Sequence, residues 1–232
     1  MGRGWRAAVP WLVGLVAAGG IGVGSALVAA RLVSGNGPAA RPAEPEVASD
    51  DIGHVHGLGR DPSDQRWYVA THAGLLRVMD EGRLLRVADR YQDTMGFTIA
   101  GPAEFLASGH PDLRDGLPTR LGLIRSTDAG LSWSAVSLTG EADLHAIVLT
   151  RGRLYAADAS SGALLVSIDS GTTWARRADV ELMALAVDPA DPDRLVGISY
   201  EGASMRSGDG GRTFDALPGP SLLSVAWGTV TI

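Results

Sequence analysis

The chain has 232 residues, and 45% of them are hydrophobic, which is enough for a sizeable core and excludes disorder as the default state. After the first acidic residue, Glu44, 16 arginines face 26 carboxylates, and this acidic balance argues against a nucleic-acid partner. The sequence lacks cysteine, which excludes disulfides and thiolate metal sites, whereas its 31 glycines and 12 prolines favour short strands joined by tight turns.

The N-terminal segment is expected to meet a membrane. After a basic start at residues 1–6, residues 7–30 carry no charge, and as a helix they would extend about 36 Å, more than the roughly 30 Å core of a bilayer. The segment could be a retained transmembrane anchor or a signal cleaved after the small residues 28–30. Its length favours the anchor, because a usual signal core has only about 7–15 apolar residues. We therefore predict a membrane-anchored or secreted protein with its folded part outside the cytoplasm.

A linker is predicted next. Residues 31–51 are rich in proline and alanine and contain almost no large apolar side chain, which is typical of an extended spacer. The globular domain is expected to cover residues 52–232.

An eight-residue motif repeats along this domain. It reads STDAGLSW at 126–133, SIDSGTTW at 167–174 and SGDGGRTF at 207–214, with serines 41 and 40 residues apart, and an eroded copy lies at 78–82. A period near 40 with several short strands per unit is typical of a β-propeller, because one small sheet cannot bury both faces and must stack on its neighbours. The sequence therefore predicts an all-β fold.

The pattern S-x-D-x-G-x-[ST]-[WF] resembles the Asp-box, or BNR repeat, of sialidase-like and sortilin-like β-propellers. Ser and Asp side chains can bond turn amides, Gly supplies a positive φ, and the aromatic ring returns to the core. We interpret the motif residues as structural rather than functional. They are Ser126, Asp128, Gly130 and Trp133, then Ser167, Asp169, Gly171 and Trp174, then Ser207, Asp209, Gly211 and Phe214.

Four blades of four strands are expected, at about 52–91, 92–140, 141–180 and 181–220, followed by a single strand of a fifth unit at 221–232. The resemblance implies six or more blades, and a ring must close to protect its sheet edges. Three explanations are open. The chain is truncated, which we favour, or a partner chain completes the ring, or four units close as a small propeller.

The candidate site follows from the resemblance, which implies that ligands bind the blade ends opposite the repeat motif. These ends comprise the loops before the first strand of each blade and after the second. All five histidines fall there, with two carboxylates that we include as candidates: His54, His56, His72, His110, His145, Asp112 and Asp143. Converging imidazoles and carboxylates could bind Zn²⁺ or Cu²⁺ or act as acid and base. The alternative is that each histidine only bonds the backbone.

Three functions are compatible with these features. The first is a membrane-tethered extracytoplasmic propeller that binds a glycan, a protein or a metal on its His-rich face. The second is a sialidase-like glycoside hydrolase, although the Arg-Ile-Pro motif of that family is absent and no tyrosine can be placed as its nucleophile. The third is a protein that handles Cu or Zn through the histidines. Whether the chain is an enzyme stays open.

Overall fold

The computed structural model describes residues 44–227. The predicted basic start, the membrane segment at 7–30 and most of the linker lie outside these residues. Within 44–227, no helix has the length and apolar character needed to cross a membrane. Apart from three single-turn 3₁₀ segments, the regular structure in this range is entirely β.

The first sheet, blade 1, contains an unexpected strand. Its four expected strands are β2 (Val55–Arg60), β3 (Trp67–Thr71), β4 (Gly74–Val78) and β5 (Leu84–Arg86), and β1 (Glu46–Val47) adds to the outer edge of β5. The 3₁₀ turns are η1 (Ser49–Asp51), η2 (Asp80–Gly82) and η3 (Val87–Asp89). The linker prediction therefore has to be corrected at its end, because Glu46 and Val47 are paired in the sheet. The outer edge of β5 presents unpaired N–H and C=O groups, and the extended residues Glu46 and Val47, neither of which is proline, pair with them.

Three four-stranded antiparallel sheets follow. Blade 2 contains β6 (Asp93–Gly101), β7 (Glu104–His110), β8 (Leu123–Ser126) and β9 (Ser134–Ser137). Blade 3 contains β10 (Leu144–Thr150), β11 (Arg153–Asp158), β12 (Ala163–Ser167) and β13 (Ala175–Asp179). Blade 4 contains β14 (Ala184–Val187), β15 (Leu195–Ile198), β16 (Ser204–Ser207) and β17 (Asp215–Ala216).

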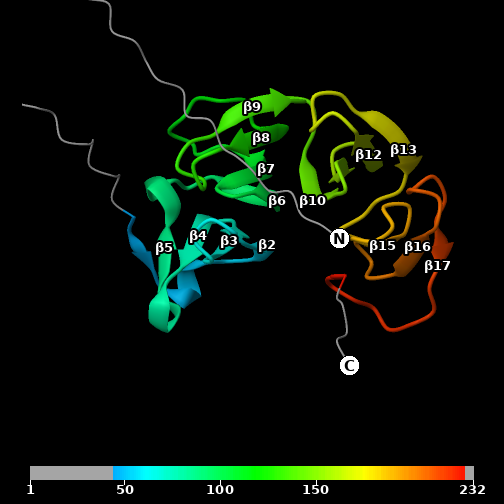
Figure 1. Ribbon diagram of the computed structural model, residues 1–232, viewed down its shortest axis with the longest axis horizontal. Coiled ribbons are helices and arrows are strands. Elements are labelled where there is room, and N and C mark those ends of the chain that lie inside the picture. The colour runs from blue at the N-terminus through cyan, green and yellow to red at the C-terminus, as the bar shows by residue number, and fades with distance from the viewer. Residues whose placement is uncertain (1–43, 228–232) are drawn as a thin grey trace, which may run out of the picture. The chain divides into compact units, whose positions relative to one another are not determined.

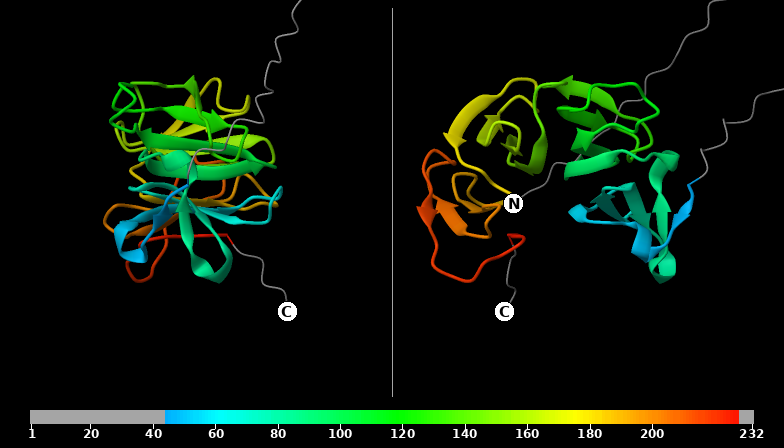
Figure 2. Two further views of the ribbon diagram at one scale, coloured as in Figure 1. Left: turned by 90° about the vertical axis from the view of Figure 1, so that its left-hand side faces the viewer. Right: turned by 180° about the vertical axis from the view of Figure 1, so that it is seen from behind.

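The four sheets follow one another round a common centre, with the first strands β2, β6, β10 and β14 innermost (Figures 1 and 2). Neighbouring inner strands contact each other in the order β2, β6, β10, β14. No strand follows β17 within the described residues: the strand expected from residue 222 onward is not formed over 222–227. Only the Leu222 amide is paired there, with the Gly202 carbonyl, and a strand needs a ladder of such bonds.

The hydrophobic core lies between the blades rather than at one centre. One cluster joins blades 1 and 2 through residues such as Tyr68 and Phe105, which are both fully buried. A second joins blades 2 and 3, and a third joins blades 3 and 4 through Tyr155 and Leu195. Each sheet therefore depends on its neighbour to bury a face.

The three full copies of the repeat motif form the same turn between the third and fourth strands of their blades. In blade 3, the Ser167 hydroxyl donates to the Asp169 carboxylate at 2.7 Å and accepts the Gly171 amide at 2.9 Å. The other Asp169 oxygen accepts the Thr173 hydroxyl at 2.6 Å. The same bonds recur in blades 2 and 4. The side chains thus satisfy a turn that leaves its backbone amides without strand partners.

The glycine of each turn packs on the preceding blade. Gly130, Gly171 and Gly211 all have positive φ, and a Cβ at these positions would lie 2.5, 2.1 and 2.4 Å from leucine methyl carbons. Those leucines are Leu75, Leu123 and Leu164, each on the third strand of the blade before. The aromatic rings of the motif, Trp133, Trp174 and Phe214, pack on the three inter-blade clusters. The repeat motif therefore connects adjacent blades.

These turns should weaken in acid. The pKa of Asp169 is lowered to about 2, first by the Thr173 hydroxyl and then by the Thr173 amide and the Ser167 hydroxyl. Because the folded pKa lies below the unfolded value of about 3.9, the ionised carboxylate stabilises the fold above pH 4 and this contribution disappears as the pH falls toward 2. We expect Asp169→Asn to destabilise the protein most at neutral pH and least near pH 2, measured by urea unfolding across that range. A difference that does not change with pH would contradict this prediction.

Candidate functional site

The five histidines lie at one end of the blades, where the inner strands begin. His54 precedes β2, His56 lies within it, His72 occupies the turn between β3 and β4, His110 ends β7, and His145 is the second residue of β10. The strand pairs place these positions together, because Val55 pairs with Thr71, Asp93 with His110, and Leu144 with Asp158. The start of each inner strand thus adjoins the end of the second strand.

His56 owes its direction to a β-bulge. The pairing of β2 with β3 passes from Val55 and Thr71 directly to Gly57 and Ala70, so His56 has no partner in the ladder. An extra residue of this kind bends the strand and re-aims its side chain. His72 is placed independently by a tight turn in which Gly74 has φ of +112° and approaches the Arg90 carbonyl too closely for any side chain.

The first three histidines form an imidazole cluster, His54, His56 and His72. The ring centroids of His56 and His72 are 4.4 Å apart, and His54 lies 5.4 Å from His72 and 6.4 Å from His56. The Nε2 atoms of His56 and His72 are separated by 3.2 Å. Two imidazoles of blade 1, those of His56 and His72, therefore meet, and the His54 ring lies beside them.

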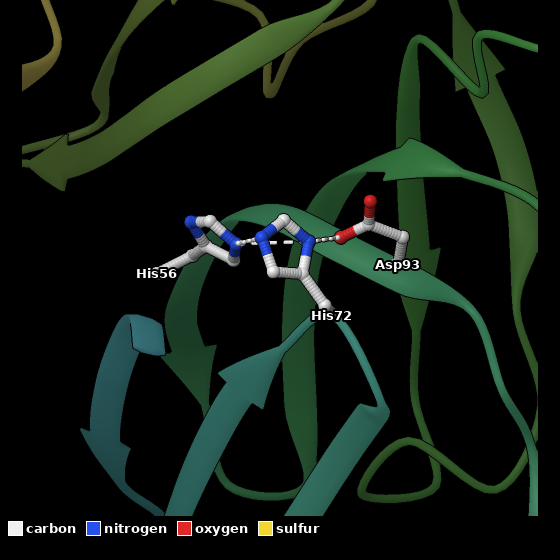
Figure 3. A group of neighbouring side chains, drawn as sticks. All are labelled: His56, His72 and Asp93. Carbon is white, nitrogen blue, oxygen red and sulfur yellow. Dashed lines mark hydrogen bonds and ion pairs between the residues drawn. The ribbon is translucent and has the colours of Figure 1, made fainter. Parts of the chain in front are cut away.

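Asp93, at the start of β6 in blade 2, orients this cluster. Figure 3 shows His56, His72 and Asp93 in a row, with Asp93 Oδ1 2.9 Å from His72 Nδ1. A carboxylate can only accept, so the His72 Nδ1 carries the proton. The His56 Nε2 lies 3.2 Å from the His72 Nε2 and 3.4 Å from the His72 Nδ1. One donor atom each from His56, His72 and Asp93 fall within 4.8 Å of one another. A carboxylate behind an imidazole is the usual support of a metal ligand.

Protonation of the cluster is disfavoured at His56. Burial lowers the pKa of His56, and the neighbouring His72 lowers it further, whereas Asp93 opposes the shift. A neutral imidazole is the form that binds a metal ion.

A second group lies on blades 2 to 4. His145 Nε2 is 3.0 Å from Asp143 Oδ2, and His145 Nδ1 is 3.0 Å from the Tyr200 hydroxyl. His110 Nε2 lies 3.8 Å from the same Asp143 oxygen, while its Nδ1 donates to the Thr119 carbonyl at 2.7 Å. Both ring nitrogens of His145 are therefore engaged, and so is one of His110.

The protonation states of this second group depend on the charges near Asp143. Burial raises the pKa of Asp143, but the His145 hydrogen bond and the charges of His145, His110 and Arg120 outweigh burial and lower it overall. Burial also raises the pKa of the Tyr200 phenol, and the charge of Asp143 adds to this effect. Asp143 is thus a carboxylate at neutral pH and Tyr200 a neutral phenol, which can donate its proton to His145.

Asp112, the remaining candidate, has another role in the structure. Its carboxylate accepts the Tyr91 amide at 2.8 Å and the Arg114 side chain at 2.6 and 2.9 Å, and it is almost fully buried. These contacts hold the loop after β7 in place. The position of Asp112 in that loop made it a candidate. In the structure its carboxylate is bound by Arg114, two residues away, and is not available to a ligand.

Sequence reasoning did not include Asp93 or Tyr200 among the candidates. Asp93 is the first residue of an inner strand, and His56 and His145 are the second residues of theirs. Its position in the sequence could therefore have identified it as a candidate. Nothing in the sequence placed Tyr200 next to His145, which is 55 residues earlier.

Comparison with known proteins yields no family model and no curated protein that matches this chain. Solved structures do match. The GH74 xyloglucanase from Xanthomonas campestris has a TM-score of 0.51 at 18% identity, covering 69% of this chain and 29% of that chain. A chain of the nidogen/laminin complex has a TM-score of 0.50 at 12% identity, covering 65% and 60%.

The fold is a β-propeller. Its all-β class and four blades are confirmed, while likeness at these identities extends to the fold alone. YCF48 bound to a D1 peptide matches with a TM-score of 0.49 at 18% identity, covering 78% of this propeller chain and 60% of that chain. Across such matches, this chain spans from 24% to 60% of the other chain's length.

Proposed function

We propose that this protein is a membrane-tethered, extracytoplasmic propeller that binds a divalent transition-metal ion, Zn²⁺ or Cu²⁺, at the imidazole cluster. The observation that carries the proposal is the 3.2 Å separation of the His56 and His72 Nε2 atoms. Two nitrogen ligands at 2.0–2.1 Å from a tetrahedral ion lie about 3.3 Å apart. The membrane tether at residues 7–30 and the placement of the propeller outside the cytoplasm are inferred from the sequence alone.

The ligands we assign are His56 and His72, together with His54, whose side chain would have to move toward them because it lies outside the group of donor atoms within 4.8 Å. Asp93 would act behind His72, because its oxygen already holds the Nδ1 proton and leaves Nε2 free. Three imidazoles leave a tetrahedral ion with one further position, which water or an external ligand would fill.

Glycan and protein ligands are the other possibilities for the same face. The GH74 neighbours are glycoside hydrolases by name, but this chain matches them only in fold. A glycosidase needs two carboxyl groups across the bond that it cleaves in a bound sugar, and no motif in the sequence assigns such a pair. The imidazole cluster is the more specific feature, and for that reason we favour the metal.

The test is a Zn²⁺ titration of the full chain in mild detergent, monitored by calorimetry. We expect the wild type to bind an ion that His56→Ala/His72→Ala loses, because two of the three ligands are removed. His110→Ala is the matched control, since that histidine lies at the same end of the blades but bonds the Thr119 carbonyl. Equal Zn²⁺ binding by the wild type and the double variant would refute the proposal.

A substitution behind the ligands gives a graded prediction. Asp93→Asn keeps the shape of the side chain but loses the charge that fixes the His72 tautomer. Changes of this kind cost about 10–100-fold in metal affinity. We expect a Zn²⁺ dissociation constant raised by that factor with unchanged stoichiometry, and an unchanged dissociation constant would place Asp93 outside the site.

A further inference from the structure

The second group of site residues contains a chain of two hydrogen bonds that the imidazole cluster does not use. Asp143 Oδ2 lies 3.0 Å from His145 Nε2, and His145 Nδ1 lies 3.0 Å from the Tyr200 hydroxyl. A carboxylate can only accept, so the proton of the neutral imidazole is on Nε2. Nδ1 is then an acceptor, and the Tyr200 hydroxyl donates to it.

The backbone of blades 3 and 4 places the three side chains. The Asp143 amide donates to the Asp158 carboxylate at 2.9 Å, which fixes the residue directly before β10. His145 is left out of the ladder between β10 and β11, and a bulge of this kind re-aims its side chain. Tyr200 lies in the short turn between β15 and β16. The phenol therefore comes from one blade, and the imidazole and the carboxylate from the blade before it.

The three groups become more buried from the phenol to the carboxylate. Tyr200 is 49% exposed, whereas the side chains of His145 and Asp143 are 21% and 14% exposed. Within residues 44–227, His145 is the only hydrogen-bond donor to the Asp143 side chain, because the second oxygen, Oδ1, is buried and accepts no bond. The phenol can thus meet a molecule from solvent, and the charge of Asp143 is in place to stabilise a protonated His145.

A hydroxyl, an imidazole and a carboxylate bonded in this order are the arrangement that activates a nucleophile. Burial and the charge of Asp143 raise the pKa of the Tyr200 phenol, so the phenol is neutral at pH 7 and needs a base when it attacks. His145 Nδ1 already accepts its hydrogen bond and can take the proton. The chain contains no cysteine and no lysine, so no thiol or side-chain amine competes with this hydroxyl.

We propose that Tyr200 is a nucleophile for acyl transfer from an aryl ester, with His145 as its general base and Asp143 as the support of the imidazolium. The phenol oxygen forms a bond to the ester carbonyl carbon, and its proton passes to His145 Nδ1. The bond from that carbon to the leaving phenolate then breaks, and His145 returns the proton to the leaving group. The products are acylated Tyr200 and a free phenol.

An aryl ester is the matching donor because its leaving group is also a phenol, so transfer to Tyr200 is not uphill. An alkyl ester would have to expel a much more basic alkoxide. None of the three residues belongs to the imidazole cluster, so failure of this proposal leaves Zn²⁺ binding untouched, and the reverse also holds.

The first experiment labels the full chain in mild detergent with phenylmethanesulfonyl fluoride, which leaves a stable adduct on an activated hydroxyl. The Tyr200 oxygen bonds to sulfur, fluoride leaves, and His145 takes the proton. Peptide mass spectrometry measures the rate at each tyrosine. Tyr91 is the internal control, because it is 48% exposed and its ring faces the Arg86 and Arg114 guanidinium groups rather than an imidazole.

We expect Tyr200 to react about 100-fold faster than Tyr91, the lower end of what a positioned base contributes. His145→Ala should remove this difference. His110→Ala is the matched control, since it deletes an imidazole at the same end of the blades that bonds the Thr119 carbonyl, and it should keep the difference. Thermal unfolding confirms that the variants are folded, and the comparison of the two tyrosines within the wild type does not depend on any variant.

The second experiment follows release of 4-nitrophenol from 4-nitrophenyl acetate. Tyr200→Phe and His145→Ala should lower the release equally, because each breaks the same chain of hydrogen bonds. Equal labelling of Tyr200 and Tyr91 in the wild type would overturn the proposal. Tyr200 labelling that His145→Ala leaves unchanged would do the same, as would ester cleavage that survives in Tyr200→Phe.

Discussion

Gly171→Ala is expected to lower the free energy of unfolding by about 3 kcal/mol or more. The residue has φ of +86°, where a side chain costs about 1–2 kcal/mol, and its new Cβ would lie 2.1 Å from the Leu123 Cδ2 atom. Leu123 is fully buried between blades 2 and 3, so it cannot move away without strain of about 1–3 kcal/mol. Urea unfolding at neutral pH measures the change.

The matched control lies in the third copy of the motif. Gly208 has no positive φ, and a Cβ there would have nothing within 4 Å. Gly208→Ala should therefore change stability by less than about 0.5 kcal/mol. Equal effects at Gly171 and Gly208 would mean that the turn glycine has no part in joining the blades.

Asp61→Ala is expected to cost about 3 kcal/mol. Asp61 is completely buried, and its Oδ1 accepts the Ser63 amide at 2.8 Å and the Ala103 amide of blade 2 at 3.0 Å. Removal of the carboxylate takes away its bonds to the amides of the exposed Ser63 and the half-buried Ala103. Hydrogen bonds to a charged group contribute about 1.5 kcal/mol or more each. The midpoint of urea unfolding should fall accordingly.

Asp188 provides the comparison, because it occupies the same turn of blade 4. It accepts the Ala190 amide at 2.8 Å and the exposed Arg194 side chain at 3.3 Å, but within residues 44–227 it has no bond like the one from Ala103 to Asp61. Asp188→Ala should therefore cost only about 1 kcal/mol. If both aspartates cost the same, the bond from Asp61 to Ala103 contributes nothing to the joining of blades 1 and 2.

The blades could be predicted from the sequence because their turns use local chemistry. A serine, an aspartate and a glycine within five residues make one turn, so the motif marks the third and fourth strands wherever it occurs. The strand at Glu46–Val47 could not be predicted, since two residues in a proline-rich stretch have no pattern of their own. They become a strand because β5 offers an open edge.

The sequence predicts which residue types form the candidate site and at which end of the blades they lie. It does not predict which residues contact each other there. His54 and His56 are two residues apart, yet the bulge at His56 decides how its side chain points. The pairs of His72 with Asp93 and of His145 with Tyr200 join different blades. Such contacts depend on the angle between sheets, which no local pattern encodes.

The packing of each motif glycine on the preceding blade has a consequence for how such a protein can be cut and recombined. The sequence repeats with the length of a blade. The segments that pack on each other, however, are the third strand of one blade and the motif turn of the next blade. Ser204 takes the position in blade 4 that leucine holds in the other three. A cassette for exchange between propellers should therefore begin inside a blade, ahead of its leucine, and not at the blade boundary.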